Sequence, residues 1–273
     1  MATRPQDRRR SGGLIRMQAP PQLLSWPRNL RPFSHQHPDL LQLRALVSLD
    51  GVVHAFETRW GSLTDVLPSP VARVHQVHGA GVCLLPPALG AREPFLRPSA
   101  RERPSGDALI TDVPGITVAV AVADCLPILI ADPRHRAVAA VHGGWRGLAS
   151  GVVHATLEAM GRNFGSDPAD CLVGIGPGIG PCCYEVGPEV IEAFAARKLD
   201  SEALVPTDGG APDGRLRCHL PAVAVAVARR DGVPRSQIAE AELCTHCHGD
   251  RLWSYRRDGE AAGRMLAGIA LLS

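Results

Sequence analysis

Aromatic residues are scarce in this chain, and long apolar runs are missing. Phe, Trp and Tyr together make up 4% of the 273 residues, and Lys198 is the single lysine among 29 basic residues. The longest apolar stretch, residues 113–131, is interrupted by two prolines, a glycine and Asp124, so it falls short of the roughly 18–20 continuous residues of a membrane span. Basic clusters interleaved with aromatics, which are typical of nucleic-acid binding, are also missing. We therefore expect no membrane and no nucleic acid among the partners.

The composition is that of a globular protein with one large domain. Hydrophobic residues make up 45% and charged residues 21%, and the formal net charge is +2. Much of the positive excess lies in the first 20 residues, which are rich in arginine. We predict a disordered, arginine-rich tail over residues 1–20 and a single catalytic domain over residues 21–273. Since no apolar segment typical of a secretory signal follows those arginines, we expect a cytoplasmic protein with reduced cysteines.

Strand-like and helix-like patterns alternate along the chain without the regular rhythm of repeated βαβ units. Branched apolar runs predict strands over residues 52–57, 71–77, 82–85, 108–111, 116–122, 127–131, 137–141 and 171–175. Apolar residues at helical spacing predict helices over residues 147–164, 188–197, 221–230 and 259–272. The proline-rich segment 86–106 is predicted to be a surface loop. This order predicts a mixed α+β domain.

Three short segments carry the histidine and cysteine side chains best suited to chemistry. His75 and His78 lie three residues apart, so in a strand they face opposite sides and at most one of them faces a given site. Cys125 interrupts two apolar strands, and His142 ends the next strand of the same predicted hairpin. Two histidines with Cys125 form a known set of catalytic zinc ligands that leaves one position for water or substrate. Alternatively, Cys125 is a nucleophile and His142 is its base.

Arginines beside glycine-rich turns are candidates for anion binding. Arg146 lies at a predicted strand-to-helix turn, where its guanidinium and the helix-opening amides can hold an anion together. Arg256 and Arg257 precede Asp258, so they either bind an anion or form a structural ion pair. The glycine-rich stretch 174–181 lacks the Gly-Lys-Ser/Thr ending of a P-loop, and we interpret it as a rigid turn or a pocket wall.

The remaining cysteines include an adjacent pair and a Cys-x-x-Cys motif. Cys244 and Cys247 have the spacing of zinc ligands, but a second pair at suitable spacing is not evident from the sequence. The adjacent Cys182 and Cys183 are poor partners for a mutual disulfide, so we interpret them as part of the core or of a pocket wall. The sequence therefore favours one metal site over two.

Taken in order, these segments resemble the laccase-domain family. The similarity lies in five motifs: Gln76-Val77-His78-Gly79, Ala123-Asp124-Cys125-Leu126-Pro127, His142-Gly143-Gly144-Trp145-Arg146-Gly147, the stretch 176–186, and Ser254-Tyr255-Arg256-Arg257-Asp258. Each motif alone is weak evidence for membership of the family. All five motifs in this order, over residues 51–273, are specific to it. Members of this family are labelled polyphenol oxidase or peptidoglycan editing factor and are now read as purine nucleoside phosphorylases.

The resemblance implies a fold and a reaction. The implied fold is a four-layer α/β/β/α sandwich resembling bacterial toxin deamidases. The implied reactions are phosphorolysis of adenosine, inosine and methylthioadenosine, and deamination of adenosine. The expected partners are therefore a purine nucleoside and phosphate, and the chain is expected to be a monomer or a homodimer. The implied cofactor is zinc, and Cu²⁺ belongs to an older description of the family.

The resemblance also assigns roles to individual residues of this chain. It implies a zinc ion held by His78, Cys125 and His142. The candidate catalytic residues are Cys125 and His142, with Asp124 as a candidate acid. The candidate contacts to substrate and phosphate are Arg59, Gln76, Arg146 and Arg256.

The chain departs from the family pattern in the segment before the first motif. A charged residue, Glu57, stands where the family has a phenylalanine in its His-Gly-Phe-Phe-Thr-Arg stretch, and Gly143 replaces an alanine. Sixteen residues separate Arg59 from Gln76, where the family has a longer helical segment. We expect the site wall built by that segment to be shorter here or to be replaced by residues 1–50.

Two other functions remain open at this point. A cysteine-dependent amidase or hydrolase acting on peptidoglycan precursors would use Cys125 to attack a carbonyl and His142 to relay protons. A copper-dependent polyphenol oxidase would follow the older description of the family.

Overall fold

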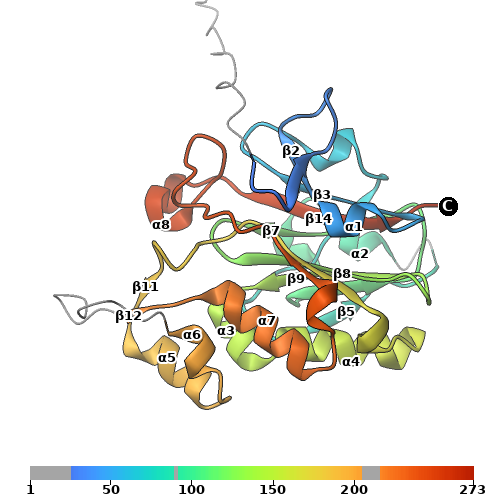
Figure 1. The fold of residues 1–273 in the computed structure, drawn as a ribbon. Coiled ribbons are helices and arrows are strands. Elements are labelled where there is room, and N and C mark those ends of the chain that lie inside the picture. Colours follow the sequence, from blue (N-terminus) through green and yellow to red (C-terminus); the bar gives the residue numbers. More distant parts are fainter. Residues whose placement is uncertain (1–25, 89–91, 205–215) are drawn as a thin grey trace, which may run out of the picture.

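Two six-stranded sheets form the centre of the molecule (Figure 1). The structure is a computed structural model that describes residues 26–88, 92–204 and 216–273. The tail predicted over residues 1–20 lies outside these residues. Both sheets mix parallel and antiparallel neighbours, so the mixed α+β class predicted from the sequence is confirmed.

The first sheet gathers strands from both ends of the chain. Its order is β1 (Leu30–Pro32), β2 (Leu40–Leu43), β3 (Val52–Glu57), β14 (Met265–Leu271), β7 (Thr117–Val122) and β4 (Val71–Ala72). The C-terminal strand β14 lies in the middle, antiparallel to β3 on one side and to β7 on the other. Residues 26–50 therefore extend the free edge of this sheet through β1 and β2.

The second sheet is built around a long hairpin. Its order is β13 (Ile238–Glu240), β10 (Leu172–Ile175), β8 (Leu126–Asp132), β9 (Ala137–Gly143), β6 (Ala108–Thr111) and β5 (Val82–Leu84). A separate ribbon pairs β11 (Glu185–Val186) with β12 (Leu216–Arg217). The hairpin β8–β9 and strand β6 agree with the predicted strands to within two residues at each end.

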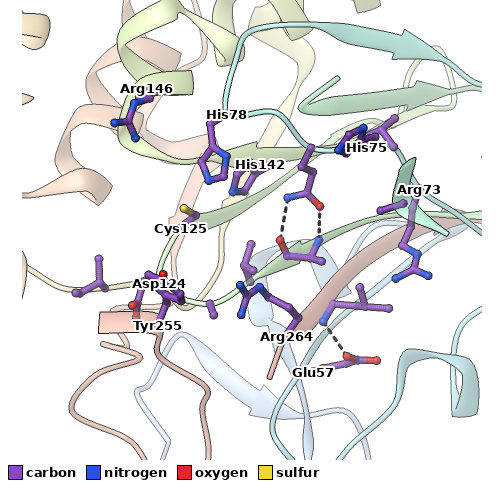
Figure 2. Close-up of a pocket in the computed structure, with 18 of the residues that line it drawn as sticks. Glu57, Arg73, His75, His78, Asp124, Cys125, His142, Arg146, Tyr255 and Arg264 are labelled. Carbon is purple, nitrogen blue, oxygen red and sulfur yellow. Dashed lines mark hydrogen bonds between the residues drawn. The ribbon is translucent and has the colours of Figure 1, made fainter. Parts of the chain in front are cut away.

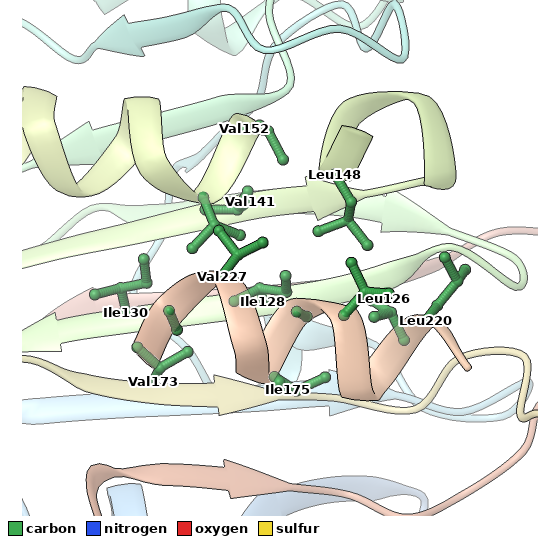
Figure 3. Packing of buried hydrophobic residues seen from close by; sticks show 14 of the residues in the cluster. Leu126, Ile128, Ile130, Val141, Leu148, Val152, Val173, Ile175, Leu220 and Val227 are labelled. Atoms are coloured by element: carbon green, nitrogen blue, oxygen red, sulfur yellow. The ribbon is translucent and has the colours of Figure 1, made fainter. Parts of the chain in front are cut away.

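Helices cover the second sheet on the side opposite the first sheet (Figures 1 and 3). The described helices are α1 (Arg44–Val47), α2 (Glu93–Leu96), α3 (Trp145–Ser150), α4 (Val152–Phe164), α5 (Pro188–Ala195), α6 (Asp200–Ala203), α7 (Leu220–Arg230) and α8 (Tyr255–Asp258). Of these, α3, α4 and α7 contact this outer side of the second sheet, whereas α1, α2 and α8 lie elsewhere. Leu157 of α4 and Val227 of α7 belong to the same buried cluster as Ile128 and Ile130 of β8. Burial of such branched side chains contributes about 1.5–3 kcal/mol each, which makes this layer a main source of stability.

The period of two along the strands decides what faces each layer. On β8, Ile128 and Ile130 face the helices, while Leu129 and Ala131 face the other sheet. On β9, Val138 and Ala140 face the other sheet, and His142 continues the same alternation. His142 therefore points into the end of the interface between the two sheets.

Two predicted helices differ from the structure. The helix predicted over residues 259–272 is wrong, because most of this segment forms strand β14 (Met265–Leu271), after a 3-10 turn at Gly259–Ala261. Both faces of β14 are covered, so almost every position is buried and no polar residue reveals the period of two. The helix predicted over residues 147–164 is broken at Gly151, which has a φ of 89° and separates α3 from α4.

The outer face of the first sheet has much less helix than the implied four-layer sandwich. Ala55 and Ala119 on this face pack against Leu63 and Leu67, and the residues around Leu63 form a single 3-10 turn, Leu63–Asp65. The sixteen residues between Arg59 and Gln76 form this turn and strand β4, with no longer helix. The described part of the chain therefore shows two sheets with one full helical layer, and the likeness to toxin deamidases stays a prediction. None of the described helices is long and apolar enough to cross a membrane.

A buried histidine in β3 gives the fold a pH dependence. His54 is fully buried, and its Nε2 accepts a hydrogen bond from the backbone N–H of Leu43 at 2.9 Å. Burial lowers the pKa of His54 to about 3, and the nearby Arg31 guanidinium adds to this effect. The folded state therefore keeps this imidazole neutral in a pH range where the unfolded chain protonates it.

We expect His54 to make the protein less stable as the pH falls. Its pKa is about 6.5 in the unfolded chain, so its contribution is complete above that pH and is lost toward pH 3, by up to about 1.4 kcal/mol per pH unit. Urea unfolding between pH 4 and 8 measures this slope, and His54→Gln, which keeps an acceptor, should flatten it. The exposed His35→Gln serves as control; an unchanged slope in His54→Gln would contradict the assignment.

Candidate metal and substrate site

The three predicted metal ligands come together although they belong to separate segments. His78 lies in the turn after β4, Cys125 directly precedes β8, and His142 lies near the end of β9. Their donor atoms, one from each side chain, all lie within 4.8 Å of one another. Pairing of β8 with β9 sets Leu126 opposite Gly143, which brings Cys125 close to His142. Figure 2 shows the three side chains gathered at one wall of a cavity.

A carboxylate from another strand holds the turn that carries His78. Asp107 is fully buried just before β6, and it accepts hydrogen bonds from the backbone N–H groups of Val77 (3.2 Å), His78 (2.9 Å) and Gly79 (2.7 Å). His78 has a φ of 61°, a region that residues with a Cβ seldom occupy. Three donors on one carboxylate stabilise this conformation and so fix the direction of the imidazole.

The same carboxylate orients the second imidazole. Oδ1 of Asp107 lies 2.8 Å from Nδ1 of His142, and both side chains are almost completely buried. Burial would raise the pKa of Asp107, but hydrogen bonds from His142 and from the backbone of Gly79 and His78 hold it below its ordinary value. An ionised Asp107 holds the proton on Nδ1, so Nε2 of His142 is the nitrogen that would bind a metal, in exchange for its own proton.

Cys125 and His142 change each other's protonation. Burial would raise the pKa of the Cys125 thiol, but hydrogen bonds from His142 and His78 lower it to about 7. Burial would lower the pKa of His142, but Asp107 and Cys125 raise it to about 9. Near neutral pH the thiol therefore loses its proton readily, and the thiolate is the form that binds a metal or attacks a carbonyl.

The space between the donors fits a small soft cation. One thiolate with two imidazoles suits zinc or copper, because both accept nitrogen and sulfur ligands. Gly144 lies against all three side chains: a Cβ built on it would be 3.1 Å from Sγ of Cys125 and 3.3 Å from Cδ2 of His78. Any side chain at this position would therefore press on the donors, so Gly144 keeps the site open.

Asp124 joins three loops beside the donors. Its Oδ1 accepts a hydrogen bond from the hydroxyl of Thr245 (2.5 Å), and its Oδ2 accepts one from the backbone N–H of Arg256 (2.6 Å). Its carbonyl accepts the N–H of Ile179 (2.8 Å), and its φ is 85°. These hydrogen bonds hold the backbone conformation of Asp124, the residue next to Cys125. The candidate acid therefore helps to position Cys125.

A cavity of about 1040 Å³ opens beside the donors. Five guanidinium groups line it, from Arg73, Arg103, Arg146, Arg256 and Arg264. Three carboxyl groups also line it, from Glu57, Asp124 and Glu260. The excess of positive charge in a partly enclosed space attracts an anion, and guanidinium groups match phosphate oxygens well. Trp145 and Tyr184 add aromatic faces to the lining.

Glu57, which departs from the family pattern, organises the wall of the cavity. Its two carboxylate oxygens accept the backbone N–H groups of Leu63 and Leu266, each at 2.8 Å. Burial raises the pKa of Glu57 above its ordinary value, although both hydrogen bonds oppose the shift. This carboxylate therefore fixes the short segment around Leu63 against the first sheet. None of the described residues 26–50 lines the cavity, so this part of the predicted segment does not replace the shortened wall.

Three of the four predicted substrate contacts line the cavity: Arg146, Arg256 and Gln76. The side-chain amide of Gln76 makes two hydrogen bonds with the backbone of Ala121. Its Nε2 donates to the Ala121 carbonyl at 2.9 Å, and its Oε1 accepts from the Ala121 N–H at 2.8 Å. Gln76 therefore ties the His78 turn to β7. Among the described residues, Arg146 forms no ion pair with a carboxylate, and its guanidinium stacks 4.3 Å from the Trp145 ring. Arg146 is the better placed of these residues to receive an anion.

Arg59 lies outside the cavity lining. Its guanidinium stacks 3.7 Å from the ring centroid of Trp253 and donates a hydrogen bond to the carbonyl of Gly249. Arg257 is likewise used within the fold, since it pairs with Asp258 at 2.7 Å and donates to three backbone carbonyls. The alternative of a structural ion pair therefore describes Arg257 well.

Sequence reasoning missed several residues that shape the site. They are Asp107, Arg73, Arg103, Arg264 and Glu57 in its structural role. Asp107 stands in no motif; its one local sign is a polar residue between a glycine and a buried strand. The arginines lie on separate loops, and only the tertiary fold brings them to one cavity.

Two solved bacterial structures share this architecture. The chain is similar to the Bacillus licheniformis hypothetical protein YfiH, with a TM-score of 0.78 and 26% identity, over 90% of this chain and 100% of that one. It is also similar to YlmD from Geobacillus stearothermophilus, with a TM-score of 0.73 and 27% identity, over 86% of this chain and 97% of that one. The chain belongs to the family described as multi-copper polyphenol oxidoreductase laccase, which matches residues 51–272.

Related proteins carry names from nucleoside chemistry. The purine nucleoside phosphorylase YfiH of Escherichia coli is 35% identical over 206 residues, 76% of each chain. A purine nucleoside phosphorylase of Bacteroides thetaiotaomicron is 38% identical over 165 residues, and the match spans 60% of either length. The adenosine deaminase RL5 of an unknown prokaryotic organism is 36% identical over 163 residues, 60% of this chain and 61% of that one. These names support a nucleoside-processing role at the level of the family.

Proposed function

We propose that this chain is a zinc-dependent purine nucleoside phosphorylase that acts on adenosine, inosine and methylthioadenosine and also deaminates adenosine. The observation that carries the proposal is the meeting of His78, Cys125 and His142 at the wall of an arginine-lined cavity. The names of the relatives from Escherichia coli and Bacteroides thetaiotaomicron support the same activity. We assign the protein to the cytoplasm.

Phosphorolysis transfers the ribosyl group from the base to phosphate. The bond between ribose C1′ and the purine nitrogen breaks, a bond from C1′ to a phosphate oxygen forms, and the departing base takes up a proton. In this proposal Arg146 and Arg256 hold the phosphate by charge-assisted hydrogen bonds. Trp145 and Tyr184 offer aromatic surface to the purine, and the cavity volume of about 1040 Å³ accommodates both substrates.

The three donors would hold the metal, and Asp107 would orient both imidazoles. Zinc bound there would supply Lewis-acid chemistry at neutral pH, and copper would be the corresponding ion for a polyphenol oxidase. Asp124 acts in this proposal as a positioning residue, because Thr245 and Arg256 engage both of its carboxylate oxygens.

A nucleoside screen with and without phosphate tests the proposal. We expect free adenine and ribose 1-phosphate from adenosine only when phosphate is present, and inosine with ammonia when phosphate is omitted. Metal analysis of the same preparation identifies the bound ion. Oxygen consumption with a phenol, in the absence of any nucleoside cleavage, would support the polyphenol oxidase instead.

Arg146→Lys is expected to weaken the apparent affinity for phosphate by about 1–2 kcal/mol, or roughly 5- to 30-fold. Lysine keeps the charge but loses the planar fork that matches two phosphate oxygens. Initial rates at varied phosphate concentration measure the effect, while zinc content should stay unchanged. The matched control is Arg162→Lys, at an exposed arginine of α4 that pairs with Glu158. An unchanged phosphate dependence in Arg146→Lys would move the phosphate role to another arginine.

One observation favours a second candidate function. Cys125, His142 and Asp107 form a chain in which a low-pKa thiol contacts an imidazole that a buried carboxylate orients. This arrangement is also that of a cysteine hydrolase or amidase. Trapping of a thioester on Cys125 with an amide substrate, in metal-free protein, would support this function and contradict a purely metal-binding role.

A further inference from the structure

A second group of cysteines lies away from His78, Cys125 and His142. Cys182 and Cys183 follow the glycine-rich loop after β10, and Cys244 and Cys247 lie in the turn after β13. The four sulfur atoms all lie within 4.8 Å of one another. Sγ of Cys247 is 3.6 Å from that of Cys182 and 3.4 Å from that of Cys183. Four thiols from two distant segments thus converge on one point.

The sulfur separations match those of a single tetrahedral metal ion. A Zn–S bond of about 2.3 Å places the corners of a regular tetrahedron about 3.8 Å apart. A disulfide would need a sulfur separation of about 2.05 Å, and all four cysteines are free. Four sulfur ligands with no nitrogen or oxygen select zinc among the common divalent ions of closed structural sites.

The backbone around the cluster is arranged as in a preformed site. Gly178 pairs with Cys244 as a short parallel bridge, and the N–H of Thr245 donates to the carbonyl of Gly178 at 2.9 Å. The N–H of Gly180 donates to Sγ of Cys244 at 3.2 Å, a bond that stabilises a thiolate. Cys182 and Cys247 are exposed, so an ion can enter from solvent.

We propose that Cys182, Cys183, Cys244 and Cys247 bind one zinc ion as a structural tetrathiolate site. The ion fastens the loop after β10 to the turn after β13. Ile179 on the first loop lines the cavity, and Thr245 on the second holds the Asp124 carboxylate. The cysteine site therefore stabilises the cavity wall that carries Asp124, without contacting the substrate.

Metal analysis in a Cys125→Ala background separates this site from the other donors. In that background we expect about one zinc per chain, and Cys125→Ala/Cys247→Ser should retain almost none. Cys125→Ala/Cys83→Ser is the matched control, because Cys83 lies on β5 outside both groups, and it should keep its zinc. The absence of zinc from Cys125→Ala, or equal zinc in all three variants, would overturn the proposal.

Alkylation of the folded wild-type protein gives a test that does not depend on how the variants fold. We expect Cys182, Cys183, Cys244 and Cys247 to be protected from a thiol reagent as purified, and to react together once a zinc chelator is added. Peptide mass spectrometry assigns each thiol. Immediate reaction of all four, a stoichiometric disulfide among them in non-reducing digests, or iron with sulfide in place of zinc would each overturn the proposal.

Discussion

Cys125→Ala is expected to remove about one equivalent of zinc per chain and to lower kcat/KM for phosphorolysis by at least about 10³-fold, or about 4 kcal/mol. Cys125 supplies the one sulfur donor of this site. Without it, two imidazoles would provide only two of the four ligands of a tetrahedral zinc ion. The fold should persist, because Cys125 is only a partly buried side chain packed against one of the two large apolar clusters, and both clusters consist of many fully buried side chains.

Metal analysis and nucleoside assays on the same Cys125→Ala preparation measure both effects. Circular dichroism confirms that the fold is retained. Cys83→Ala is the control, since it removes a half-buried thiol elsewhere in the second sheet, and it should match the wild type in both measurements. Full zinc content in Cys125→Ala would contradict the ligand assignment. Loss of zinc with normal phosphorolysis would separate the metal from the reaction.

Asp107→Ala is expected to have the largest effect on stability, a loss of about 3–5 kcal/mol. The substitution removes a fully buried carboxylate that accepts hydrogen bonds from the ring of His142 and from the backbone of Val77, His78 and Gly79. Breaking a buried, hydrogen-bonded pair on one side costs this much because the remaining donors stay buried without partners. Urea unfolding at neutral pH measures the change.

Asp107→Asn distinguishes the role of Asp107 in orienting the metal ligands from its role in stabilising the fold. Asparagine keeps the size of the side chain and part of its hydrogen bonding, so the loss of stability should be smaller than in Asp107→Ala. Zinc affinity should still fall by about 10- to 100-fold, because the neutral amide no longer fixes the tautomer of His142. Competition with a chelator measures this affinity. Asp112→Asn, at an exposed position five residues along the chain, is the control; wild-type affinity in Asp107→Asn would contradict the orienting role.

The sequence by itself predicted most of the strands and three side chains, His78, Cys125 and His142, that the structure brings together as a candidate metal site. The hairpin β8–β9 and strand β6 were predicted because short runs of branched apolar residues, bounded by turn residues, are typical of buried strands. The candidate ligands followed from motif order: spacing alone left His75 and His78 as alternatives, and the resemblance to the family selected His78. In the structure Asp107 accepts a hydrogen bond from the N–H of His78, whose side chain lies beside Cys125 and His142.

The sequence was misleading where a strand is buried on both faces, because such a strand lacks the alternation of polar and apolar residues. Residues 265–271 contain Ala, Gly and Leu in an order that suits a helix, and the expected helix was wrong. This segment becomes the central strand β14 because β3 and β7 offer it hydrogen-bonding edges on both sides. Such a choice depends on partners that lie about 145 and 210 residues earlier in the chain, and no local pattern contains it.

Only the tertiary structure decided which polar groups meet. Asp107 joins His78 and His142, although it stands in no motif of the sequence. The adjacent pair Cys182 and Cys183 was expected in the core or a pocket wall, and the fold brings it to the Cys-x-x-Cys turn more than 60 residues later. Metal sites and buried hydrogen-bond networks require atoms within a few ångströms, and for distant segments that proximity is set by how strands pair and sheets pack.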